Sequence, residues 1–267
     1  MKRCASMMAL LLLSSVYIFG QGGRGQQAQA PATAKAAAPL DLTGYWVSVV
    51  TEDWRWRMVT PPKASFPSIP LNAAGRRIAN AWDPAKDEAE GNQCKAYGAA
   101  AIMRLPTRLH ITWENDNTLR VDTDAGTQTR MFQFGNSTPP AGEPAWQGYS
   151  VAQWEFAGLT GKPAGGSLKA VTNRMRPGYL QKNGVPYSGN AVVTEYFDVF
   201  KAPNGDVWML VRTMVDDPQY LEKPPAEAFG SRYQPAVGAR YGPFVRTTNF
   251  KKLPDAKGWN PTPCSAR

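Results

Sequence analysis

The sequence predicts an all-β protein, an antiparallel β-barrel with one short helix and a long insert after the first strand. Between residues 108 and 250, apolar and polar side chains alternate in successive runs, as they do when they point to opposite faces of a strand. Gly, Pro and Asn separate these runs, and only one segment has the pattern of a helix. Short antiparallel strands at such spacing are typical of a closed barrel or a sandwich.

The first strand of the domain is expected at 44–57. Its even positions carry Trp46, Glu52, Trp54 and Trp56, so that one carboxylate shares a face with three tryptophans. This face has the composition of a ligand pocket, which combines apolar walls with a few polar groups.

The insert spans Pro61 to Arg104 and contains the one predicted helix, at 73–82. Asn72 is the expected N-cap, and Asp83-Pro84 ends the helix because the residue before a proline disfavours helical geometry. Residues 87–91 are expected to form a polar turn.

The remaining strands follow from the alternating runs. Asn204-Gly205 between two such runs indicates a hairpin, and the first three runs form a meander. The expected strands are 108–114, 118–123, 128–134, 149–156, 168–176, 191–200, 207–215 and 244–250.

Residues 1–30 are interpreted as a signal peptide. Lys2 and Arg3 precede an apolar run at 7–20 that is too short to span a membrane; an uncleaved N-terminal anchor is the alternative. Residues 31–40 are predicted to be a disordered segment before the domain, and residues 41–267 are predicted to form a single β-barrel domain. No later stretch is apolar enough for a transmembrane helix. The protein is therefore expected to be exported, to the periplasm or beyond the cell.

The formal net charge of +9 comes from scattered basic residues. A nucleic-acid-binding protein should show a clustered basic stripe, so we expect no nucleic-acid partner. Metal sites are not expected, because the chain has one histidine. It also lacks the glycine-rich motifs that bind phosphates or dinucleotides, so no cofactor is predicted.

Removal of the signal peptide would take Cys4 away and leave Cys94 and Cys264. In an oxidising compartment a lone pair of cysteines usually forms a disulfide. Such a bridge would tie the C-terminal tail to the segment after the first helix. Two free thiols or a metal site are the alternatives.

Two resemblances bear on the fold. Gly44-x-Trp46 at the start of the domain resembles the opening of the lipocalin-like (calycin) barrels. In that family the tryptophan closes one end of the barrel and a late arginine packs over it, a role that the resemblance gives to Arg246. The chain also resembles a group of uncharacterised exported bacterial proteins, which supplies no reaction. The residues that carry this second resemblance are Asp83-Pro84, 94–98, 129–131, 146–150, 194–197 and 217–220.

Three residues are candidates for acid–base chemistry. Glu52 among tryptophans would be desolvated, which raises the pKa of a carboxyl group; pairing with an arginine is the alternative. Glu195 points to an apolar face of its strand and needs a partner, for which neighbouring strands offer Arg174, Arg176 and Arg212. His110 would be a general base if its polar face lined the barrel.

The candidate ligand-binding residues are the two later tryptophans of the first strand and three residues on or near the loop after 173, namely Trp54, Trp56, Arg174, Tyr179 and Tyr187.

Three functions remain open. The first is an exported barrel that binds a small apolar or aromatic molecule. The second is a cofactor-independent lyase, isomerase or cyclase that uses a desolvated glutamate, and the third is a structural protein of the envelope. The oligomeric state is left open.

Overall fold

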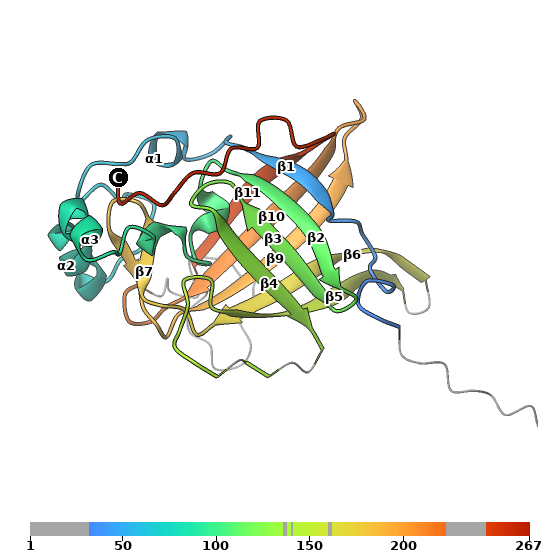
Figure 1. Ribbon diagram of the computed structural model, residues 1–267, viewed down its shortest axis with the longest axis horizontal. Coiled ribbons are helices and arrows are strands. Elements are labelled where there is room, and N and C mark those ends of the chain that lie inside the picture. Colours follow the sequence, from blue (N-terminus) through green and yellow to red (C-terminus); the bar gives the residue numbers. More distant parts are fainter. Residues whose placement is uncertain (1–31, 136–137, 140, 160–161, 223–243) are drawn as a thin grey trace, which may run out of the picture. The chain divides into compact units, whose positions relative to one another are not determined.

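The computed structural model describes residues 32–135, 138–139, 141–159, 162–222 and 244–267. Within these residues nine strands form a closed barrel (Figure 1), which confirms the predicted all-β fold class. Around the ring the strands are β1 (Gly44–Val49), β11 (Phe244–Leu253), β10 (Val207–Asp216), β9 (Val192–Lys201), β6 (Lys162–Asn173), β5 (Tyr149–Leu159), β4 (Gln128–Phe134), β3 (Thr118–Thr123) and β2 (Arg108–Asn115).

The strand pairings of the barrel are antiparallel at every junction except one. β9 and β10 have the longest unbroken register, from Val207↔Lys201 to Asp216↔Val192. β4 and β5 run in the same direction and share only the pairs Phe132↔Ser150, Gln133↔Val151 and Phe134↔Ala152. The segment between these two strands therefore has to return along the barrel before β5 begins.

Side chains fill the barrel interior. Leu109, Ile111, Phe132, Phe197 and Phe250 come from four of its strands and are all buried in one apolar cluster. Interiors of small barrels are commonly packed in this way. A cavity for a ligand therefore has to be sought outside this cluster.

The first strand is shorter than expected. β1 ends at Val49, and residues 54–57 form the one-turn helix α1 (Trp54–Arg57). Asp53 has a φ of 51°, a left-handed conformation that aspartate tolerates better than most residues. The prediction of a strand through Arg57 was therefore wrong, and the alternation of side chains does not extend to Glu52, Trp54 and Trp56.

The insert contains the predicted helix as α2 (Ala73–Ala81). Asn72 caps it, since its Oδ1 accepts a hydrogen bond from Gly75 N at 2.9 Å. Further helical turns follow at α3 (Pro84–Ala89), η1 (Lys95–Tyr97) and η2 (Ile102–Arg104). The polar turn expected at 87–91 is partly helical, because Asp83 caps α3 and Asp87 is buried beside Lys95.

A second apolar cluster lies beyond one end of the barrel. The segment predicted as a loop after Arg176 forms the hairpin β7 (Gly178–Gln181) and β8 (Val185–Tyr187). Leu180 and Tyr187 of this hairpin pack with Leu71, Ala79 and Ala99 of the insert. In Figure 1 the labels α2, α3 and β7 lie together at this end of the barrel.

Trp46 is fully buried, and its Nε1 donates a hydrogen bond to Leu42 O at 2.8 Å. The cation over its ring is Lys252, whose Nζ lies 5.4 Å from the ring centroid. Arg246 does not occupy this position, because it pairs with Thr213 toward the other end of β11. The expected packing of Arg246 over Trp46 was therefore wrong.

Cys94 and Cys264 form the predicted disulfide across 170 positions of sequence. The tail that it holds also bonds to the barrel, since Thr262 N donates to Asp124 O at 2.8 Å. The disulfide therefore joins the C-terminal tail to the start of η1, as expected.

The predicted signal peptide at 1–30 lies outside the described residues. Residues 32–40, expected as part of a disordered lead-in, include a turn whose Lys35 N donates to Asp116 O, while Ala34 O accepts from Trp154 Nε1 at 2.8 Å. Over the described part of the chain, no helix has both the length and the apolar character needed to cross a membrane.

Candidate functional site

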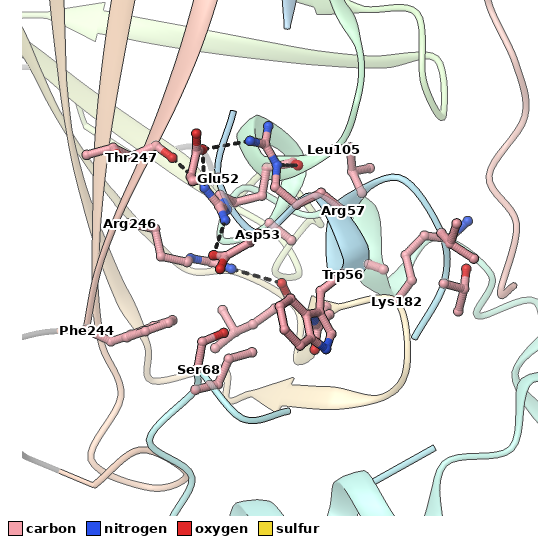
Figure 2. Close-up of a pocket in the computed structure, with 18 of the residues that line it drawn as sticks. Glu52, Asp53, Trp56, Arg57, Ser68, Leu105, Lys182, Phe244, Arg246 and Thr247 are labelled. Carbon is pink, nitrogen blue, oxygen red and sulfur yellow. Dashed lines mark hydrogen bonds and ion pairs between the residues drawn. The ribbon is translucent and has the colours of Figure 1, made fainter. Parts of the chain in front are cut away.

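A cavity of about 290 Å³ lies where α1, η2, β7 and the start of β11 meet. Its walls combine charged, aromatic and aliphatic side chains, many of which Figure 2 shows. The lining residues include Glu52, Asp53, Trp56, Arg57, Val59, Ile69, Arg104, Leu105, Leu180, Lys182, Phe244 and Arg246. The volume is near the lower end of the roughly 300–1,000 Å³ range of ligand pockets.

Glu52 is held by two arginines. Its Oε1 lies 2.7 Å from Arg57 Nη1 and 2.9 Å from Arg104 Nη1. Its Oε2 accepts a hydrogen bond from Thr51 Oγ1 at 2.6 Å. The arginine-paired alternative is therefore the arrangement that the structure shows for Glu52.

Arg104 connects the two acidic residues to the barrel. Its Nη2 lies 2.7 Å from Asp53 Oδ2, and its Nη1 also donates to the main-chain oxygen of Thr247 on β11. Arg57 Nε in turn donates to Arg104 O at 2.9 Å. These contacts fix α1 against η2 and β11, which explains why the chain leaves the strand conformation after Val49.

Burial and the neighbouring charge of Arg104 lower the pKa of Arg57 to about 10, against the attraction of Glu52 and Asp53. Arg57 therefore remains charged at neutral pH. Two carboxylates and two guanidinium groups offset each other in this part of the wall.

Arg246 is a third guanidinium at the cavity, on the opposite side of Glu52 and Asp53 from Arg57 in Figure 2. Its Nη2 donates to Ala100 O at 2.7 Å and its Nη1 to Leu180 O at 3.1 Å. The ring of Phe244 lies 5.2 Å from its guanidinium carbon. Arg246 thus connects the β7–β8 hairpin and the insert to β11 through hydrogen bonds to two uncharged main-chain carbonyl groups.

The rest of the wall is largely apolar. Trp56 is half-buried and donates from Nε1 to Ser65 Oγ at 3.4 Å, and Phe244 lies on the side of Arg246. Val59, Ile69, Leu105 and Leu180 supply aliphatic surface. Trp54, the other predicted ligand-binding residue of this segment, is 58% exposed and does not line the cavity.

Glu195 is buried in the barrel interior and does not line this cavity. Its partner is Arg130 of β4 rather than Arg174, Arg176 or Arg212. Nη2 of Arg130 lies 2.6 Å from Oε2 of Glu195, and Nη1 lies 3.2 Å from Oε1. Glu52 and Glu195 therefore do not meet in a common pocket.

His110 lies on the outer face of β2, between the buried residues Leu109 and Ile111. Its ring stacks on Tyr45 with centroids 4.1 Å apart, and Trp259 of the tail lies edge-on at 6.2 Å. It does not line the barrel interior, because the inward positions of β2 are its neighbours.

The three candidates from the segment after 173 also lie away from the cavity. Tyr179 Oη donates to Asp87 Oδ2 at 2.7 Å, and burial together with this carboxylate raises the pKa of Tyr179. Tyr187 is fully buried, and burial raises the pKa of its hydroxyl group. Arg174 Nη2 donates to Gly142 O at 2.8 Å.

Sequence reasoning identified Glu52 and Trp56 as site residues but not Arg57, Arg104 and Arg246. One local signal for the helical turn existed: Asp53 and Arg57 have the i,i+4 spacing of opposite charges on a helix, although in the structure Arg57 pairs with Glu52 and Asp53 with Arg104. That spacing favours a helical turn over a continued strand.

No group of three or more His, Cys, Asp or Glu side chains suited to a metal ion occurs in the described part of the chain. Comparison of the chain with protein-family models, with curated proteins and with solved structures finds no match.

Proposed function

We propose that this protein binds a small, partly aromatic or apolar molecule in the cavity between α1, η2, β7 and β11. One observation carries the proposal. The cavity has an aromatic and aliphatic wall beside a cluster of fixed charges, whereas the barrel interior is packed with its own side chains. Apolar walls with a few convergent polar groups are the usual composition of ligand sites.

The arrangement gives less support to the alternative of acid–base catalysis. Glu52 already accepts three hydrogen bonds, two of them from guanidinium groups, which leaves about one of its four lone-pair sites. A general base needs a free lone pair directed at the substrate proton. The third alternative, a structural protein of the envelope, does not require a cavity of this composition.

We further propose that the protein is an exported, lipocalin-like barrel. Support comes from Gly44-x-Trp46, from the basic and apolar N-terminus at 2–20 and from the Cys94–Cys264 disulfide, since disulfides persist in oxidising compartments. A mass-spectrometric N-terminus of the protein after fractionation of the producing cells tests this proposal. Recovery of uncleaved protein from the cytoplasm alone would contradict it.

Binding can be tested with benzyl alcohol as a neutral aromatic probe, by calorimetric titration of the purified protein. Trp56→Ala removes one cavity wall and is expected to weaken binding about three- to ten-fold, the equivalent of roughly 0.5–1.5 kcal/mol for an aromatic contact. Trp54→Ala is the matched control from the same helix, and it should leave the affinity unchanged. Equal effects of the two substitutions would argue against this cavity as the binding site.

A probe-independent test is to denature the purified protein and to identify co-purified small molecules by mass spectrometry. The expected result is a molecule that is retained by the wild-type protein and by Trp54→Ala, and depleted in Trp56→Ala. Equal retention by all three proteins would place the molecule elsewhere.

A further inference from the structure

The charges around the cavity do not cancel. Arg57, Arg104 and Arg246 line the cavity together with Glu52 and Asp53, so these five residues carry a formal charge of +1. Lys182, which also lines the cavity, adds to the positive sign, although its Nζ donates to the main-chain oxygen of Arg267 in the tail.

The excess charge belongs to Arg246. Arg57 and Arg104 each have a carboxylate within 2.9 Å. Across the described ranges, no carboxylate forms an ion pair with Arg246, and its two hydrogen bonds go to the neutral carbonyls of Leu180 and Ala100. A guanidinium group offers five N–H donors, and the described residues accept only these two hydrogen bonds from Arg246.

The surroundings of Arg246 make this charge costly. Its Nε is buried and has no hydrogen-bond partner among the residues that the structure describes. Burial and the nearby charges of Arg104 and Arg57 lower the pKa of Arg246 to about 9, while Asp53 and Glu195 oppose the shift. The group nevertheless remains protonated at neutral pH. A partly buried cation without a counter-ion is stabilised when an anion binds beside it.

The strand register determines the face of the sheet to which the Arg246 side chain projects. Arg246 lies opposite Thr213 of β10, which lies opposite Glu195 of β9. Directly paired residues project to the same face of a sheet. Glu195 lies on that face, but it forms its ion pair with Arg130, and no ion pair joins it to Arg246 in the described part of the chain.

Building on the proposed function, we propose that the ligand is a small monocarboxylate, whose carboxylate lies beside Arg246 and whose apolar part lies against Trp56 and Phe244. A planar carboxylate matches the fork of a guanidinium group. One negative charge would offset the charge of Arg246, the guanidinium group of the cluster that forms no ion pair in the described part of the chain. The limited volume of about 290 Å³ favours a molecule with a single ring or a short chain.

Three probes of one shape and different charge test this assignment: benzoate, benzyl alcohol and benzylamine, each titrated calorimetrically into the wild-type protein at neutral pH. Benzoate is expected to bind about ten-fold or more tightly than benzyl alcohol, as for hydrogen bonds to a charged group. Benzylamine should bind most weakly. Equal affinities for the three probes would overturn the charge assignment and leave the proposed function intact.

The role of Arg246 is tested by Arg246→Met, which should lower the affinity for benzoate to that for benzyl alcohol. The matched control is Arg212→Met, an exposed arginine on β10. Arg246→Lys should keep part of the preference for benzoate, and it serves if the methionine variant does not fold. An unchanged preference in Arg246→Met or its loss in Arg212→Met would overturn the proposal.

Two further outcomes separate the alternatives. If phenyl phosphate binds more tightly than benzoate, the ligand is better described as a phosphate ester, and the assignment of a monocarboxylate is wrong. If none of the probes binds at millimolar concentration and the denatured protein releases no molecule, both the proposed function and this inference are wrong.

Discussion

Nη2 of Arg130 lies 2.6 Å from Oε2 of Glu195 inside the barrel, and neither side chain is exposed to solvent. Thr172 Oγ1 accepts a further hydrogen bond from Arg130 and lies 2.7 Å from Ser150 Oγ. This polar group lies beside the apolar cluster of the interior, and the barrel strands bury other polar side chains as well, among them Thr213 and Thr248. Its role is best described as structural, since the two charges satisfy each other.

Glu195→Gln is expected to destabilise the protein by about 3–5 kcal/mol, because it leaves the Arg130 charge buried without a counter-ion. Chemical denaturation of the wild-type protein and the variant measures the difference. Glu155→Gln is the matched control, since Glu155 forms a half-exposed ion pair with Lys169 at 3.1 Å; it should change stability by about 1 kcal/mol or less.

The double variant Arg130→Met/Glu195→Leu should be more stable than Glu195→Gln, because neither charge remains to be solvated. A double variant that is less stable than the single one would show that the surrounding hydroxyl groups need the ion pair.

Arg104→Met is expected to cost about 3 kcal/mol or more, because this one side chain bonds to Glu52, Asp53 and the main chain of β11. Arg55→Met on the same helix should be within about 0.5 kcal/mol of the wild type, since Arg55 is exposed and its guanidinium group stacks on the exposed ring of Trp54. Thermal denaturation of both variants checks this difference. Similar losses would contradict the account of how α1 is held.

Glu52→Gln should strengthen the binding of benzoate, because it removes one negative charge from the cavity wall while it keeps the shape of the side chain. The gain is expected to be a few-fold, since Glu52 is partly exposed and its charge is screened. Calorimetric titration with benzoate and benzyl alcohol measures it. A weaker affinity for benzoate in this variant would show that the ion pairs of Glu52 with Arg57 and Arg104 are needed to shape the binding site.

Replacement of both cysteines by serine should lower stability by about 3–5 kcal/mol, because the disulfide closes a loop of 170 positions and restricts the unfolded chain. The same change is expected when the wild-type protein is denatured in the presence of a reductant. If reduction leaves the denaturation midpoint unchanged, the remaining contacts of the tail suffice to hold it.

Much of the barrel follows from the sequence, because alternation reports directly on a strand with one buried face. The strands at 118–123 and 128–134 have the predicted bounds, and β10 differs from its prediction only by the addition of Asp216. The disulfide was predicted because export to an oxidising compartment was expected and because only Cys94 and Cys264 would remain after removal of the signal peptide. These features depend on local pattern or on the small number of cysteines, both of which a single sequence displays.

The site was less accessible to such reasoning. The alternation of residue types that predicts a strand continues beyond Val49. The segment is not a strand, however, because it is held by ion pairs to Arg104, which lies 52 positions from Glu52 in the sequence. Glu195 was expected to have an arginine partner, yet Arg130 is 65 positions away and no periodicity connects the two. Contacts between distant charged residues depend on how the strands are ordered around the ring, which one sequence does not show.

A closed ring of strands can alternate in direction all the way round only if their number is even. With nine strands, one junction must join like-directed neighbours, and this chain has it between β4 and β5. Three paired positions close that junction, against the ten that join β9 to β10. The ring is therefore expected to open there first, and hydrogen–deuterium exchange should be faster for the amides of Ser150 and Ala152 than for the buried amides of β10.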